Sequence, residues 1–271
     1  MKHSYSILLA LLLAACSSND QTSTKQVESA AANPSLNMEW DTLSLDVEGG
    51  DCQHDENNCI TVHYLWMQSK GTDSFTQQIN QLIQTYFLGI PEDSATTPEQ
   101  VAQQYLADYD SLKKTTHETS AWQIERELQL LANPYQVLSF RLETYDFTGG
   151  VNPSSLSSFL NLNPQNGQKL QLSTLFSDVH RDTLSKLASE CFALDQAILL
   201  KKMEGRFELS FTNDIYKLND NFGFTESGLL FVLNNFEYST TGEPVEFTIP
   251  YSRLQEAGLI NEEWPFKKPE A

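Results

Sequence analysis

Basic side chains are scarce in this sequence of 271 residues. Lysine and arginine together number 17, against 36 aspartates and glutamates, which sets the formal net charge at −19. Proteins that bind nucleic acid gain much of their affinity by neutralising phosphates with basic groups, so this balance argues against a nucleic-acid partner. The same charge would attract a basic partner at long range. Many soluble proteins are also acidic, so charge alone does not specify a partner.

Long apolar runs are also rare, and the clearest one lies at the N-terminus. Lys2 precedes the apolar stretch 7–15, which ends in two alanines. This order is typical of a secretory signal peptide, and the stretch is too short to cross a bilayer. Residues 13–16, Leu-Ala-Ala-Cys, resemble the lipobox, where lipoprotein signal peptidase cleaves after diacylglycerol is attached to the cysteine. The sequence predicts a leader over 1–15 and a lipid anchor on Cys16, with an ordinary secretory signal as the alternative.

Large apolar residues are nearly absent from the next segment, residues 16–38. Such a polar stretch cannot bury enough apolar surface to offset the entropy lost on ordering, so we expect a flexible tether after the lipidated Cys16. Two or three acyl chains, at about 0.8 kcal/mol per buried methylene, would hold the protein firmly on its membrane. Ser17 is not aspartate, which in Gram-negative lipoproteins permits export to the outer membrane. The predicted location is therefore a lipid-anchored position in the cell envelope, facing the periplasm in a Gram-negative host.

Cysteine is infrequent, and three of its four positions lie beyond the proposed anchor. Cys52 and Cys59 flank a polar loop, and in an oxidising compartment we expect them to form a disulfide worth roughly 2.5 kcal/mol. The alternative is a metal site that uses both thiols with His54 and His63, although the spacing does not match a structural zinc pattern. Cys191 falls on the apolar face of a predicted helix, where a free thiol behaves as a small core residue.

Apolar spacing predicts three helices, at about 73–89, 98–114 and 178–200. The second helix begins with Thr97 as N-cap and a proline in its first turn, which is a strong start signal. A run of β-branched and aromatic residues over 60–67 predicts a strand. We expect an α+β fold, in which an antiparallel, hairpin-rich sheet has the helices packed on one face.

From residue 122 the apolar period changes to two, which predicts a strand, and a second strand follows after a short connection. Matching their apolar faces places Leu128 opposite Leu138 and Glu125 opposite Arg141. Arg126 lies on the apolar face without an evident structural reason. Glu125 and Glu127 are either a solvated face or a carboxylate pair for acid–base chemistry.

Two blocks of sequence resemble one known family. Residues 145–178 carry an aromatic residue, Thr-Gly-Gly, an alternating strand, an Asn/Gly turn, a Leu-x-Leu strand and a Leu-Phe pair; residues 221–251 carry a Phe-rich strand, Thr-Glu-Ser-Gly and a closing Ile-Pro-Tyr. This order resembles the domain of unknown function numbered 3298, shared by the lysozyme-sensing anti-sigma factor of Gram-positive bacteria and some peptidoglycan deacetylases. Upstream, the strand at Ile60 and the following helix resemble its companion domain, numbered 4163. The resemblance implies an N-terminal subdomain over 39–118 and a C-terminal domain over 119–268.

One position departs from this family. Relatives usually carry Gly-Gly-Ala-His where this chain has Gly149, Gly150, Val151 and Asn152, so no imidazole is present here. Glycines allow positive φ, which serves either a sharp turn or a close approach of the backbone to a ligand. Gly149, Gly150 and Asn152 therefore form a candidate binding loop, with a plain turn as the alternative.

Motifs of catalysis are missing: the sequence contains no nucleophile elbow, no His-Glu-x-x-His helix, no phosphate-binding glycine loop and no dinucleotide fingerprint. No metal or cofactor is predicted, and we expect a protein that is not an enzyme. In the resembling deacetylases the catalytic machinery occupies a separate domain, so the resemblance favours binding.

The leading hypothesis is an envelope lipoprotein that binds a basic, lysozyme-like protein or peptidoglycan. The charge of −20 that remains once Lys2 is lost with the leader agrees with the first of these partners. One alternative is a cell-wall-modifying hydrolase that uses carboxylates such as Glu125, Glu127, Glu143 and Asp146. The other is a structural envelope lipoprotein without catalysis.

Overall fold

The computed structural model describes residues 23–27, 38–116, 120–202, 218–234, 244–262, 264–266 and 268. The predicted leader, Cys16 and most of the predicted tether lie outside these residues. Among the described residues, no helix combines the length and apolar character needed to span a membrane.

Six strands form the larger sheet, in the order β1-β2-β3-β4-β5-β6. Their bounds are Ser23–Val27 (β1), Trp40–Gly50 (β2), Cys59–Ser69 (β3), Trp122–Leu131 (β4), Leu138–Thr148 (β5) and Ser154–Leu162 (β6). The strand β1 lies within the segment predicted as a flexible tether and pairs antiparallel with β2. An outer strand offers unpaired backbone groups, which explains how a polar segment can add to the sheet there.

Two helices cover one face of this sheet. α1 (Ser74–Leu88) and α2 (Pro98–Thr116) follow β3 and pack against β2 and β3. Side chains from this face and from both helices form one continuous core. α1 lies within the predicted 73–89, where Asp73 caps it and Gly89 ends it at φ 66°. α2 begins at Pro98 as predicted, with Thr97 and Gln100 forming its capping box, and it ends at Thr116 instead of residue 114.

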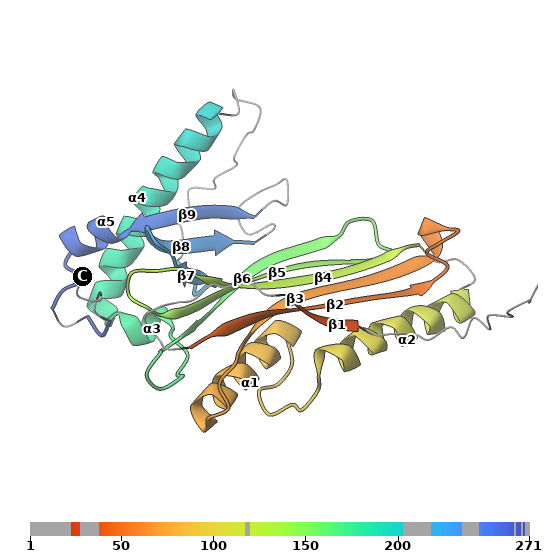
Figure 1. The fold of residues 1–271 in the computed structure, drawn as a ribbon. Helices are drawn as coiled ribbons and strands as arrows, with labels where there is room; N and C mark the ends of the chain where they lie inside the picture. The colour runs from red at the N-terminus through yellow and green to blue at the C-terminus, as the bar shows by residue number, and fades with distance from the viewer. Residues whose placement is uncertain are drawn as a thin grey trace, which may run out of the picture.

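Three further strands form a second sheet, β7-β8-β9, that the sequence did not predict as separate. These strands span Phe222–Phe224, Gly228–Leu233 and Val245–Pro250. The helices near them are α3 (Leu172–Leu175), α4 (Asp178–Lys202) and α5 (Tyr251–Glu256). A short 3₁₀ turn, η1 (Glu56–Asn58), lies elsewhere, between β2 and β3. Figure 1 shows α1 and α2 along the larger sheet, with α4 and α5 beside β9 at the end where β7 lies.

The α+β class is confirmed, with two differences in arrangement. The pair β3–β4 is parallel, because the chain crosses over through α1 and α2 before it returns to the sheet. The third predicted helix, observed as α4, packs on β9 and not on the larger sheet. The phenylalanine-rich strands β7–β9 bury an apolar surface of their own, and α4 supplies Leu184, Ala188 and Phe192 to cover it. The boundary predicted at residues 118/119 falls between α2 and β4, and the larger sheet continues across it.

Candidate functional site

The predicted binding loop is the tip of the β5–β6 hairpin. Gly149 has φ +84°, a backbone conformation that strains other residues, and a Cβ built on it would lie 2.1 Å from Ser120 Oγ, which would have to move. Gly150 meets no such obstacle, and Val151 is 96% exposed. Gly149, Gly150 and Asn152 do not line either of the two cavities described below. The turn geometry accounts for Gly149, while a binding role of the loop stays a prediction.

The two cysteines of the polar loop form a disulfide, Cys52–Cys59, as predicted. Because both thiols are consumed, the alternative metal site is wrong. The two histidines proposed for it bond to carboxylates: His54 Nδ1 lies 2.8 Å from Asp51 Oδ1, and His63 Nδ1 lies 2.5 Å from Asp46 Oδ1. The described part of the chain contains no cluster of three or more groups suited to a metal. Cys191 is free and buried, as its helical position predicted.

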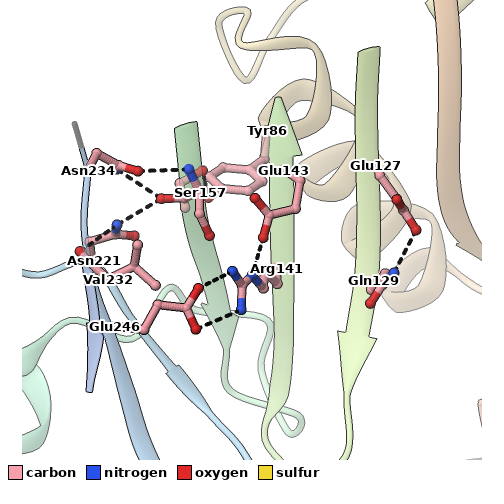
Figure 2. Close-up of polar contacts among 11 residues, drawn as sticks. Tyr86, Glu127, Gln129, Arg141, Glu143, Ser157, Asn221, Val232, Asn234 and Glu246 are labelled. Atoms are coloured by element: carbon pink, nitrogen blue, oxygen red, sulfur yellow. Dashed lines mark hydrogen bonds and ion pairs between the residues drawn. The ribbon is translucent and has the colours of Figure 1, made fainter. Parts of the chain in front are cut away.

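One face of the larger sheet, on the side opposite α1 and α2, carries several carboxylates. We call it the acidic face, and its carboxylates are Asp46, Glu48, Glu125, Glu127 and Glu143. Glu127 stands directly opposite Glu143 on the neighbouring strand, an arrangement that like charges disfavour. Arg141 offsets part of this repulsion, since it pairs with Glu143 and with Glu246 of β9 (Figure 2). The proposed carboxylate pair Glu125 and Glu127 is half-buried on this face, where each side chain accepts a hydrogen bond from a glutamine of the same strand.

The other face holds a cavity of about 620 Å³ between the end of α1 and strands β4–β6. Gly89 ends α1 in the left-handed conformation, and residues 90–92 then form one wall. The polar residues of the lining come from both sides: Thr85, Tyr86, Glu92, Arg126, Thr144, Asp146, Ser158, Lys169 and Asn234. Of the four carboxylates suggested for a hydrolase, Asp146 lines this cavity and the other three lie on the acidic face.

Arg126 is held at both ends of its guanidinium group. Its Nη1 donates to the carbonyl of Phe87 at the end of α1, at 3.0 Å, and its Nη2 donates to Tyr105 Oη of α2, at 3.4 Å. The guanidinium carbon also lies 6.0 Å from the ring centre of Tyr64, within reach of a cation–π interaction. Its Nε is buried and has no hydrogen-bond partner among the described residues.

Asp146 is the second polar group without a full set of partners. Its Oδ1 is buried and unpartnered within the described part of the chain. Burial raises the pKa of Asp146 above its ordinary value, and the positive charge of Arg126 offsets part of that effect. Buried polar atoms are normally paired, so an unpartnered donor and acceptor on two residues that line one cavity mark it as a candidate ligand site.

Tyr86 and Ser158 fix the opposite side of the cavity. The Tyr86 hydroxyl donates to Ser158 Oγ at 2.7 Å, and burial raises the pKa of Tyr86 to about 12. The phenol therefore stays neutral at physiological pH. On the outer edge of β6, Asn234 accepts from the Ser157 N–H at 2.8 Å and donates to its carbonyl at 2.9 Å (Figure 2). This pair of bonds holds Asn234 at the cavity wall.

A second cavity, of about 640 Å³, lies between β2–β3 and α1. Its amide side chains are engaged locally: Gln77 donates to Thr72 O, and Asn80 bonds both backbone groups of Ser69. Ser69 of this lining has one buried oxygen, Oγ, without a partner among the described residues, whereas the lining around Arg126 has both an unpartnered donor and an unpartnered acceptor, so we treat that cavity as the candidate site.

The sequence indicated one residue of this site and did not indicate the other residues of its lining. Arg126 stood out as a charged residue on an apolar strand face. Asp146 also interrupts the apolar positions of its strand, but the sequence suggested for it only the role of a catalytic carboxylate. The contribution of residues 90–92 and of Asn234 could not be foreseen, because these segments are distant in the chain.

Comparison with known proteins supports the family resemblance for part of the chain. The family model described as deacetylase PdaC matches residues 53–155. A solved structure of a DUF3298 family protein from Bacteroides fragilis is 20% identical, with a TM-score of 0.63 over 81% of this chain and 92% of that one. Another, from Pseudomonas aeruginosa, is 16% identical, with a TM-score of 0.54 over 79% and 92%. The search of curated proteins found no match. The resemblance to companion domain 4163 stays a prediction, and the chain has the fold of these DUF3298 family proteins.

Proposed function

We propose that this chain is a cell-envelope lipoprotein whose folded part binds a peptidoglycan-derived ligand in the cavity around Arg126. The observation that carries the proposal is that two residues lining one cavity, Arg126 and Asp146, each have a buried polar atom without a partner in the described part of the chain. A volume of about 620 Å³ falls within the range of small-ligand sites. The PdaC match supports a cell-wall context, although it names a deacetylase and covers residues 53–155.

Binding is favoured over glycoside hydrolysis because one of the two carboxylates in the described lining is engaged in an ion pair. Glycoside hydrolysis uses two carboxyl groups that flank the bond to be cleaved. In the described lining, the carboxylates are Asp146 and Glu92, and Glu92 is exposed and paired with Lys169. The absence of enzymatic activity stays a prediction.

Calorimetric titration with soluble peptidoglycan fragments tests the cavity. Leu156→Trp would fill it, since Leu156 is 47% exposed and lies in its lining, and we expect binding to be lost. Val151→Trp places the same ring on the predicted binding loop and should leave binding intact. If Val151→Trp abolished binding and Leu156→Trp did not, the site would be the loop. If the unmodified chain did not bind the fragments, the proposal would be rejected.

A second candidate partner is a basic, lysozyme-like protein on the acidic face. The repulsion between Glu127 and Glu143 favours it, because a cationic partner would relieve that repulsion. We expect lysozyme to bind more weakly as salt is raised from low to moderate concentration, and more weakly still to Glu125→Gln/Glu127→Gln/Glu143→Gln. Salt-independent binding, or none, would remove this candidate.

The proposed anchor can be tested separately from the ligand. Intact-mass measurement of the native protein should show acyl chains on Cys16, and Cys16→Ser should move the chain from the membrane fraction to the soluble envelope fraction. An unmodified thiol at Cys16 in the native protein would reject the lipoprotein assignment.

A further inference from the structure

The charges that line the cavity are balanced before any ligand enters. Arg126 and Asp146 have opposite charges, and the charge of Arg126 acts on the Asp146 carboxyl. Lys169 forms an ion pair with Glu92 at the same lining. The charge of an ionised ligand would find no free counter-charge in the described lining of this partly dehydrated space, which is costly. The balance favours an uncharged ligand.

The unpartnered atoms then specify which groups that ligand needs. Each Nη atom of Arg126 makes one hydrogen bond, to Phe87 O or to Tyr105 Oη, whereas Nε has no partner among the described residues, so Nε–H is the donor that most needs an acceptor. Asp146 Oδ1, as part of a carboxylate, is an acceptor. A ligand that complements the site must therefore present one acceptor and one donor together.

We propose that the cavity binds an uncharged ligand through a secondary amide, whose carbonyl accepts from Arg126 Nε and whose N–H donates to Asp146 Oδ1. This inference rests on the proposed ligand-binding function of the cavity and deepens it. A secondary amide carries one acceptor and one donor, which are the two kinds of partner that this pair of atoms lacks among the described residues. Each unmade bond at a buried group is costly, so the site discriminates against ligands without the amide.

Apolar residues of the same lining suit the group attached to such an amide. Ile90, Leu142 and Leu156 supply apolar wall next to the polar pair. An acyl methyl group would bury its surface there. N-acetyl amino sugars and short peptides both provide an amide with a small apolar substituent, and the experiment separates these two sources.

The test compares probes that carry an amide with probes that lack one. Calorimetry on the full chain would use triacetylchitotriose, its deacetylated counterpart chitosan trimer, cellotriose, and N-acetylalanine methylamide as the peptide probe. We expect triacetylchitotriose or the peptide probe to bind at least tenfold more tightly than chitosan trimer and cellotriose. Preference for the acetylated sugar assigns the amide to a glycan, and preference for the peptide probe assigns it to a peptide.

Variants of the polar pair locate the amide. Arg126→Lys keeps the charge and lacks the Nε–H, and Asp146→Asn replaces the acceptor oxygen pair by an amide; each should weaken binding at least tenfold. Arg181→Gln and Asp110→Asn, at exposed positions on α4 and α2, serve as controls and should bind normally. If the variants of the pair fail to fold by circular dichroism, the probe preference of the unmodified chain decides.

The outcomes separate this inference from the proposed function. Equal binding of cellotriose and triacetylchitotriose, lost in Leu156→Trp, would overturn the amide while the cavity remained the site. If peptidoglycan fragments bound but neither amide probe did, the amide would likewise be overturned while the cavity remained the site. Absence of all binding would overturn both.

Discussion

At the scale of single residues, Arg126 shows how a polar side chain is accommodated on a buried strand face. The end of α1 presents the free carbonyl of Phe87, and α2 presents the hydroxyl of Tyr105, so the guanidinium group is bonded where the strand alone offers no partner. Carbonyls in the last turn of a helix lack intrahelical partners, and cations are favoured there. Arg126, which the sequence alone did not explain, is thus anchored through its two Nη atoms, and its Nε–H has no acceptor among the described residues.

Gly149 is a position where the backbone demands glycine. Gly149→Ala should destabilise the fold by about 1–3 kcal/mol, because φ is +84° and the new Cβ would collide with Ser120 Oγ. Gly150→Ala is the matched control, since its Cβ would meet nothing closer than 3.8 Å. Urea unfolding of both variants measures the difference. Equal midpoints would show that the positive φ is not maintained in solution.

Asp146 should make stability depend on pH. Its pKa is raised by burial above the ordinary 3.8, so ionisation penalises the folded state more than the unfolded state. The penalty is absent below the unfolded pKa, grows as pH rises, and is complete above the raised folded pKa. The variant Asp146→Asn does not ionise and avoids this penalty. The difference in free energy of unfolding, variant minus unmodified chain, should therefore increase from pH 3.5 to pH 7. Urea unfolding at both values, with Asp110→Asn as control, checks this; a difference independent of pH would contradict it.

At the scale of elements, the β4–β5 pairing shows the limit of pattern matching. The predicted register placed Leu128 opposite Leu138 and Glu125 opposite Arg141, whereas Leu128 pairs with Leu142 and Gln129 pairs with Arg141. The shift keeps every side chain on its predicted face, because side chains alternate with a period of two. The connection decides the register: Asn133 accepts from the N–H groups of Tyr135 and Val137, which holds a longer loop than expected.

The disulfide closes the connection between β2 and β3 around η1. Cys52→Ala/Cys59→Ala should lower the free energy of unfolding by about 2.5 kcal/mol, chiefly because the unfolded chain gains freedom. Thermal melts of the unmodified chain with and without a reductant provide a second measurement, and the double variant should not respond to the reductant. An unmodified chain that is equally stable in reductant would contradict the expected contribution.

At the scale of the whole molecule, the two sheets meet through buried polar groups. Ser139 donates to Asn161, Asn161 donates to the carbonyl of Phe222 at 2.7 Å, and the N–H of Phe224 donates to Ser139 at 2.9 Å. Arg141 of β5 adds an ion pair to Glu246 of β9. These contacts join two apolar cores that are otherwise distinct.

Asn234 belongs to this junction and to the cavity wall. Asn234→Ala should cost about 1–3 kcal/mol, because it leaves the N–H of the buried Ser157 without its acceptor. Asn152→Ala, at an exposed position of the hairpin tip, is the control and should have little effect. Denaturant unfolding measures both. A neutral Asn234→Ala would show that water replaces the lost bond and that the junction does not depend on this residue.

The sequence by itself determined the local features of this protein. The three long helices, the disulfide, the burial of Cys191 and the α+β class follow from short-range rules of capping, periodicity and spacing, which act between residues close in the chain. The tertiary structure alone decided the second sheet, the parallel β3–β4 pair, the register of β4 with β5, and the cavity. Each of these depends on contacts between distant segments, such as Arg126 with Phe87 or Ser157 with Asn234, and no local pattern encodes which distant surfaces bury each other best.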